Sequence, residues 1–271
     1  MSRKIPTPEE VARIIDHTIL KPYATARDID RYCEEAIKYG FNAVFVHPCW
    51  VKYCVERLKG TEVKVGSVVG FPQGAELPEV KAYSAEKLVS LGVQEIDMVM
   101  NISAFRNGDY DLVKKDIEGV VRAAGDVPVK VIIEVGYLTD EDIIYACKIA
   151  MEAGASFVKT ATGLGPLGAF PHHVRIMRET VGNKMGVKAA GGIRDFKTAV
   201  RLIMAGADRI GTSTGVAVIE TAKDAKFDEE EDPCLTCPSY YASKDKMPED
   251  VYEYYKSKCL KCPHAKYGGK H

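Results

Sequence analysis

The sequence predicts an α/β fold, a (β/α)8 TIM barrel followed by a short C-terminal cysteine-rich extension. The chain has 271 residues, and one such barrel typically takes about 250. Short β-branched runs alternate with longer amphipathic stretches, which is typical of parallel strands joined by crossover helices. Polar side chains recur where the predicted strands end, and that rim holds the chemistry of barrel enzymes; they are Asp97, Glu134, Lys159, Lys188 and Ser213.

Eight segments have the composition of strands. Their residues are apolar on both sides of the pleat, which favours a sheet covered by helices. Because the order of strands cannot be read from one sequence, a doubly wound open sheet is the alternative to a barrel. The predicted strands are Asp16–Leu20, Asn42–His47, Val63–Gly70, Gln94–Met100, Val129–Val135, Ser156–Ala161, Gly186–Ala190 and Asp208–Thr212.

Six helices are predicted between the strands. Thr139, followed by acidic residues, has the pattern of an N-cap, and glycines follow several segments where a left-handed C-cap is needed. The pattern ends after Glu220, so we expect a barrel domain over 1–225 and an extension over 226–271. The predicted helices are Ala26–Tyr39, Pro78–Leu91, Tyr110–Ala124, Thr139–Ala153, Phe170–Val181 and Asp195–Ala205.

The composition is that of an ordinary globular protein, with 46% hydrophobic residues, 28% charged residues and a net charge of -1. This balance argues against a surface that binds nucleic acid or membranes through charge. The N-terminal segment MSRKIPTPEE lacks the apolar region of a secretory signal, and no apolar run is long enough to span a bilayer. We therefore expect a cytoplasmic protein.

Two lysines near strand ends are the sharpest chemical feature. Lys159 lies late in the apolar segment Ser156–Ala161, and Lys188 lies in Gly186–Ala190. Burial lowers the pKa of a lysine and frees its amine to form a Schiff base, although a lysine at a strand end can also snorkel to solvent. If the two strands are neighbours, each ammonium disfavours the other. Spacing alone does not say which lysine is the nucleophile.

Two aspartates are candidates for supporting roles. Asp97, inside the strand Gln94–Met100, is interpreted as a proton relay or as an ion-pair partner of Lys188. Asp16, at the start of the first strand, is interpreted as a binder of substrate hydroxyls or as a turn residue.

Glycine-rich loops after the last two strands indicate a phosphate site. Gly191 and Gly192 follow the seventh strand, and Gly211–Gly215 follows the eighth. Glycine lets the backbone approach an anion, and these are the loops that usually bind phosphate in barrels. Arg194 is a candidate for added positive charge or a plain surface residue.

The extension contains two CxxC pairs, Cys234 with Cys237 and Cys259 with Cys262. Such pairs resemble a structural zinc site, because tetrahedral zinc accepts four thiolates. Disulfides or redox chemistry, and the lack of any joint site, are the alternatives.

The motifs together resemble the deoxyribose-phosphate aldolase family of class I aldolases. They occur in order over most of the chain: DHTILKP (16–22), VGFPQG (69–74), EIDMV (95–99), KVIIE (130–134), FVKTATG (157–163), VKAAGGIR (187–194) and RIGTSTG (209–215). The resemblance implies reversible cleavage of 2-deoxy-D-ribose 5-phosphate to glyceraldehyde 3-phosphate and acetaldehyde. It implies no metal or organic cofactor for catalysis.

The resemblance also implies roles for residues. Lys159 would form the Schiff base, Lys188 would perturb it and Asp97 would relay protons. The predicted substrate-binding residues are Asp16, Thr160, Thr162, Gly163, Gly191, Gly192, Arg194, Gly211 and Ser213.

The chain departs from the family at Ala161, where a serine is common, and at Leu164, where some members have a basic residue. The alternatives are therefore a related class I aldolase or transaldolase-like enzyme with another short aldehyde or phosphosugar, or a non-catalytic barrel serving as a platform for the extension. A barrel isomerase would instead rely on a carboxylate base. We expect a small phosphosugar substrate, a homo-oligomer, and neither nucleic acid nor membrane as partner.

Overall fold

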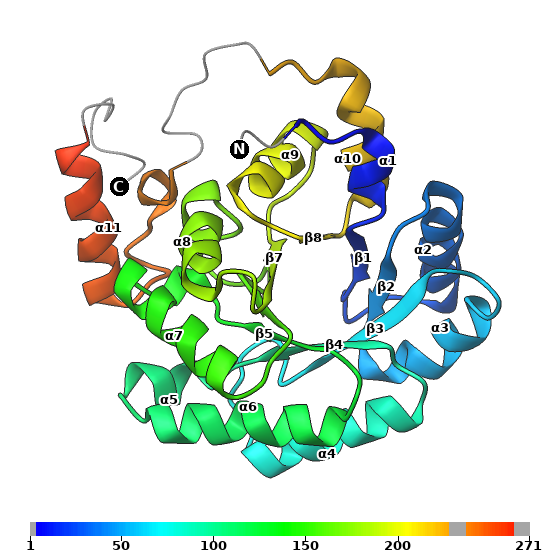
Figure 1. Cartoon of the computed structure of the whole chain (residues 1–271), viewed down its shortest axis with the longest axis horizontal. Helices are drawn as coiled ribbons and strands as arrows, with labels where there is room; N and C mark the ends of the chain where they lie inside the picture. Colours follow the sequence, from blue (N-terminus) through cyan, green and yellow to red (C-terminus); the bar gives the residue numbers. More distant parts are fainter. Residues whose placement is uncertain (1–3, 228–236, 263–271) are drawn as a thin grey trace.

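Eight parallel strands close into a barrel in the computed structural model, which describes residues 4–227 and 237–262. Each strand pairs with its neighbour in sequence, and β1 pairs with β8 to complete the ring (Figure 1). The predicted barrel is confirmed, and the open sheet is excluded. The strands are β1 (Ile15–Ile19), β2 (Ala43–Val46), β3 (Lys64–Val69), β4 (Glu95–Val99), β5 (Val129–Ile132), β6 (Phe157–Lys159), β7 (Gly186–Ala190) and β8 (Arg209–Thr212).

All eight predicted strands are present, but β5 is shorter than expected. It ends at Ile132, whereas the prediction continued to Val135. Glu134 has a left-handed backbone with φ 53°, and an extended strand cannot pass through that conformation.

Helices surround the barrel (Figure 1). The six predicted helices are confirmed to within one or two residues, and the short α1, α3, α5, α10 and the C-terminal α11 were not predicted. Helix α3 has only seven residues and follows directly on the 3-10 turn Pro48–Trp50. The α-helices are α1 (Pro8–Ala12), α2 (Ala26–Tyr39), α3 (Val51–Arg57), α4 (Pro78–Ser90), α5 (Ile102–Arg106), α6 (Tyr110–Ala124), α7 (Asp140–Glu152), α8 (Pro171–Val181), α9 (Phe196–Ala205), α10 (Gly215–Glu220) and α11 (Glu249–Lys261).

The predicted N-cap at Thr139 is confirmed. Its side chain accepts a hydrogen bond from the Asp142 N–H, and the Asp142 carboxylate accepts one from the Thr139 N–H. This reciprocal capping box satisfies two backbone donors and fixes where the loop after β5 becomes α7.

A buried ion pair joins two of the outer helices to the sheet. Lys81 of α4 donates to Asp116 of α6 at 2.6 Å and to the Val99 carbonyl at the end of β4 at 3.0 Å. Both side chains are fully buried. The pair therefore fixes α4 and α6 against each other and against β4.

The C-terminal helix α11 packs on the outside of the barrel beside α7 and α8 (Figure 1). It contributes to a small second hydrophobic cluster, separate from the main core, which we call the extension cluster. Its members are Leu167, Ala242, Met247, Val251, Tyr252 and Tyr255. Leu167 belongs to the loop between β6 and α8, so this cluster joins the extension to a loop at the carboxyl end of the strands.

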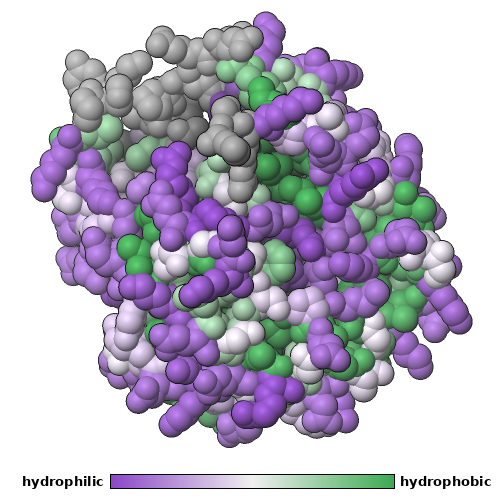
Figure 2. All heavy atoms as spheres, viewed as in Figure 1, coloured by the Kyte–Doolittle hydropathy of each residue, from purple (hydrophilic) through white to green (hydrophobic). Residues whose placement is uncertain are grey.

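The surface is mainly hydrophilic on the face that Figure 2 presents, with small hydrophobic areas between charged side chains. In the described part of the chain, every helix is too short or too polar to cross a membrane.

Candidate active site

Two lysine amines meet one carboxylate at the carboxyl end of the barrel. Lys159 is the last residue of β6 and lies in register with Lys188 of β7. The Nζ atoms of Lys159 and Lys188 lie 2.8 Å and 2.7 Å from the same oxygen, Asp97 Oδ2. Asp97 comes from β4, across the barrel mouth. The three predicted catalytic residues therefore form one cluster.

A network of buried charges lies below this cluster, inside the barrel. Asp16 pairs with Lys188 at 2.6 Å and with Arg209 at 2.9 Å. Lys130 pairs with Glu95 at 2.7 Å and with Asp97 at 3.2 Å. Lys188 also lies over the Phe45 ring, 3.9 Å from its centroid. The network holds Asp97 and Lys188 in fixed positions beneath Lys159.

Sequence reasoning missed Glu95, Lys130 and Arg209 as members of this network. All three are charged residues within predicted strands and within the family motifs, and this could have marked them as members of the network. Their partners come from strands on other sides of the barrel, which only closure of the ring brings together.

Burial lowers the pKa of Lys159 to about 8; Asp97 opposes this shift, and Lys188 adds to it. For Asp97, burial alone would raise the pKa, but the ammonium groups of Lys159, Lys188 and Lys130 together bring it well below its usual range. Asp97 is therefore an anion at neutral pH. With a pKa of about 8, a minor fraction of the Lys159 amines is neutral and nucleophilic at pH 7.

A cavity of about 270 Å³ opens above Lys159. Most of the predicted substrate-binding residues line it, together with Lys159 itself: Thr162, Gly163, Gly191, Gly192, Arg194, Gly211 and Ser213. It is also lined by residues that were not predicted as substrate-binding, among them Thr18, Lys21, Tyr32, Phe71 and Leu164. Thr18 and Lys21 lie in the quoted motif 16–22, so a signal for them was present.

Two predicted substrate-binding residues do not line the cavity. Asp16 is fully buried in the charge network, neither a turn residue nor at the cavity wall. Thr160 is also fully buried, and its hydroxyl donates to the Ala190 carbonyl at 2.8 Å. Thr160 points away from the cavity because side chains alternate along a strand, and its neighbour Lys159 points in.

Steric crowding explains why residue 191 is a glycine. Its φ is +99°, and a Cβ there would lie 2.9 Å from the Gly168 Cα atom. A larger residue would push apart the loops that follow β6 and β7. The close approach seen here is between two loops, and the approach to a phosphate stays a prediction.

Glu134 also belongs to the site. In the sequence it stands out only as a polar residue at the end of a predicted strand. It is almost fully buried, and it accepts hydrogen bonds from the Thr162 N–H at 3.1 Å and from the Thr162 hydroxyl at 2.5 Å. Burial raises the pKa of Glu134. A left-handed non-glycine residue is strained, and such strain is found at functional sites. Glu134 positions the loop that lines the cavity.

The predicted zinc site finds no support in the described part of the chain. Cys234 lies outside the described residues. Cys237, Cys259 and Cys262 are free thiols, and across 4–227 and 237–262 no three His, Cys, Asp or Glu side chains gather as metal ligands would.

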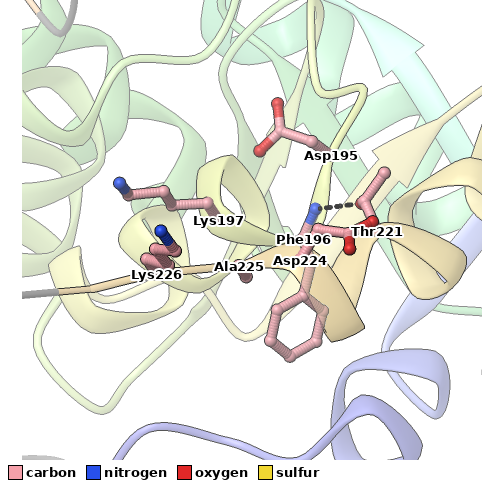
Figure 3. A pocket seen from close by; sticks show the side chains of 7 residues that line it. All are labelled: Asp195, Phe196, Lys197, Thr221, Asp224, Ala225 and Lys226. Atoms are coloured by element: carbon pink, nitrogen blue, oxygen red, sulfur yellow. Dashed lines mark hydrogen bonds between the residues drawn. The ribbon is translucent and has the colours of Figure 1, made fainter.

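Another hollow lies beside the start of α9 (Figure 3). It is lined by Asp195, Phe196, Lys197, Thr221, Asp224, Ala225 and Lys226. None of the predicted site residues lines it, and neither of its lysines is buried. The cavity above Lys159 is therefore the candidate active site.

Comparison with known proteins identifies the family of this chain. The family model described as DeoC/LacD family aldolase matches residues 11–220. Deoxyribose-phosphate aldolase of Thermococcus gammatolerans is 55% identical over 221 residues, which cover 80% of this chain and 98% of the relative. The enzyme of the same name from Methanothermobacter thermautotrophicus is 56% identical over 217 residues, covering 80% of this chain and 96% of the relative.

A solved tetrameric deoxyribose phosphate aldolase from Aeropyrum pernix has the same fold. It superimposes with a TM-score of 0.76 at 35% identity, over 80% of this chain and 92% of that chain. Residues 11–220, which the family model matches, hold all eight strands and every residue of the Lys159 cluster. The chain belongs to the DeoC/LacD family of aldolases.

Proposed function

We propose that this chain is a deoxyribose-phosphate aldolase that cleaves 2-deoxy-D-ribose 5-phosphate to glyceraldehyde 3-phosphate and acetaldehyde, reversibly, through a Schiff base on Lys159. The observation that supports this best is the shared contact of Lys159 and Lys188 with Asp97 Oδ2. A nearly dry amine beside a second cation and a relay carboxylate suits imine chemistry.

The reaction would begin with neutral Lys159 attacking the C1 aldehyde of the open-chain sugar. Loss of water from the carbinolamine gives a protonated imine. Removal of the C3 hydroxyl proton then breaks the C2–C3 bond, and its electron pair moves into the imine to give an enamine. Glyceraldehyde 3-phosphate leaves. Protonation of the enamine at C2, followed by hydrolysis of the imine, releases acetaldehyde and restores Lys159.

The proposed proton carriers are Asp97 and Lys188, with a water in the cavity. Asp97 Oδ2 contacts both amines, so a proton can pass between Lys159 and Lys188 by way of a briefly protonated Asp97. Lys188 is held between Asp16 and Asp97, which keeps its ammonium beside the reacting nitrogen. No step of this scheme needs a metal ion or organic cofactor.

The phosphate would bind at the wall formed by Gly163, Gly191, Gly192 and Ser213, with Arg194 at the exposed rim. Glycine backbones allow close approach of a phosphate to N–H groups. The names of the relatives support a phosphosugar substrate.

We also propose that the barrel domain covers 1–225 and the extension 226–271.

The proposal includes a homo-oligomer, supported by the tetramer of the Aeropyrum pernix enzyme. Light scattering coupled to size exclusion would give the mass in solution. A value near the chain mass of 29.8 kDa would contradict this part of the proposal.

The function is tested by assaying cleavage of 2-deoxyribose 5-phosphate against 2-deoxyribose. We expect turnover of the phosphorylated sugar with a much lower KM. Lys159→Arg keeps a cation but removes the nucleophile, so we expect turnover to be abolished while the circular dichroism spectrum stays unchanged. Turnover of the unphosphorylated sugar alone would favour another short-chain aldolase, and turnover by Lys159→Arg would exclude the Schiff base.

A further inference from the structure

The C-terminal helix α11 makes its most buried contact at the carboxyl end of the strands. Tyr255 is fully buried, and its hydroxyl donates to the Leu138 carbonyl at 3.0 Å. His173 Nε2 lies 2.9 Å from the same hydroxyl oxygen. Because the tyrosine proton is used on Leu138, His173 donates to Tyr255 from Nε2. Burial lowers the pKa of His173 to about 3, so it is neutral.

Tyr255 therefore joins the end of one loop on the active-site face to the start of helix α8. Leu138 ends the turn that follows β5, and His173 lies in the first turn of α8, just after the loop that follows β6. Because Tyr255 belongs to α11, this connection depends on α11 being docked on the barrel. The contact is a buried hydrogen-bonded bridge, which leaves unsatisfied polar groups if it is removed.

Around this bridge α11 packs on the β6–α8 loop itself, residues 160–170. Leu167 of this loop is buried in the extension cluster together with Val251, Tyr252 and Tyr255. Two residues further on, the Ala169 N–H donates to the Gly191 carbonyl at 2.9 Å. The packing of Leu167 is thus separated by one residue from a direct hydrogen bond to the glycine loop of the cavity.

The β5–α7 loop and the β6–α8 loop also touch each other directly, closer to the cavity. A Cβ on Gly136 would lie 2.7 Å from Pro166 Cγ and 2.8 Å from the Leu167 N atom. Two residues before Gly136, the Glu134 carboxylate accepts hydrogen bonds from the Thr162 N–H and hydroxyl. A continuous series of packed groups therefore runs from α11 through Leu167 and Gly136 to Thr162 beside Lys159.

The segment before α11 borders the same region. Pro248 lines a hollow together with Glu134, Thr162 and Leu164, and Asp250 forms an ion pair with Arg106 at 2.6 Å. Near the other end of α11, Lys258 Nζ lies 2.5 Å from Asp140 Oδ2, and His172 Nε2 lies 2.9 Å from the same oxygen. These contacts hold both ends of α11 on the barrel rim.

The two relatives described above have no segment that could correspond to α11. The family model ends at residue 220, and α11 begins at Glu249. The two relatives described above are matched over 98% and 96% of their own length, so neither has a remaining segment long enough to supply it.

We propose that α11 is a positioning element for the active site, which fixes the β6–α8 loop through Tyr255 and Leu167 so that Thr162, Gly163 and Gly191 bind the substrate phosphate. This inference rests on the proposed function. Tyr255 touches no substrate; it acts through the loop. Loosening the loop would weaken phosphate binding while leaving Lys159, which is held by the strands, able to form its imine.

The test compares Tyr255→Phe with the control Ser257→Ala, an exposed position on the same helix. Tyr255→Phe keeps the ring and removes only the bridging hydroxyl. We expect its KM for 2-deoxyribose 5-phosphate to rise by about threefold to tenfold, the effect of one buried hydrogen bond. We expect the rate of borohydride trapping by acetaldehyde, which has no phosphate, to stay unchanged. Ser257→Ala should match the wild type in both.

Leu167→Ala provides a second variant from the loop side and should also raise KM for the phosphosugar without slowing acetaldehyde trapping. Equal KM values for wild type and both variants would overturn the inference. So would equal losses with the phosphosugar and with acetaldehyde, since these indicate general damage to the fold. If the wild type itself traps no aldehyde, the proposed function fails, and that result is distinct from failure of the inference.

Discussion

At the scale of residues, the chemistry depends on the charge around Lys159. Its side chain is only 5% exposed, and its nearest charged group is Asp97. Burial and Lys188 favour the neutral amine, whereas Asp97 favours the ammonium. The amine is therefore reactive near neutral pH without being fully deprotonated there.

The pH dependence of imine formation follows from this balance. The rate of trapping by acetaldehyde and borohydride should rise with pH through about 8 and then level off, because the neutral amine is the nucleophile. Asp97 raises the pKa of Lys159, so Asp97→Asn should move the rising limb to lower pH. Trapping rates, measured from pH 6 to 10, check this independently of later proton transfers. A limb that moves to higher pH in Asp97→Asn would contradict the electrostatic account.

At position 164 the cavity of this chain has a leucine, where some family members have a basic residue. It is 69% exposed and lines the cavity beside Gly163. An exposed lysine there would meet the phosphate in solvent, where ion pairs contribute about 0.2–1 kcal/mol. We expect Leu164→Lys to lower KM for the phosphorylated sugar by up to about fivefold. KM for unphosphorylated deoxyribose is the control, and an equal decrease for both sugars would show that charge is not the cause.

At the scale of elements, the buried pair between α4 and α6 is the clearest case of stability that depends on a polar contact. Lys81 and Asp116 are both inaccessible, and Lys81 also donates to the end of β4. Removing one partner leaves an uncompensated buried charge, whereas replacing both with apolar residues removes the problem.

Lys81→Met should lower the free energy of unfolding by about 3–5 kcal/mol, as expected for breaking a buried pair. The double variant Lys81→Met with Asp116→Leu should be clearly more stable than the single one. Urea unfolding at pH 7 measures both. If the double variant is less stable than Lys81→Met alone, the lost Val99 contact and packing would outweigh the charge effect.

The elements also show where prediction from sequence succeeds. All eight strands were found because buried parallel strands are short, apolar and regularly spaced. Helix α3 was missed because it has only seven residues and follows directly on the turn Pro48–Trp50. The early end of β5 was missed because nothing local indicates that Glu134 adopts φ 53°.

At the scale of the whole molecule, barrel closure decides which site residues meet. Asp16 and Arg209 lie 193 residues apart in sequence, yet they share an ion pair because β1 pairs with β8. This explains why the lysines and glycine loops could be predicted from their motifs, whereas the charge network below them and the true position of Asp16 could not. The docking of α11 depends likewise on contacts between Tyr255 and residues 82 and 117 positions away.

The most direct test of the account is borohydride reduction in the presence of 2-deoxyribose 5-phosphate, followed by peptide mass mapping. Activity should be lost irreversibly, and the reduced adduct should lie on the peptide that contains Lys159. An adduct on Lys188 alone, or none at all while turnover proceeds, would contradict the central claim.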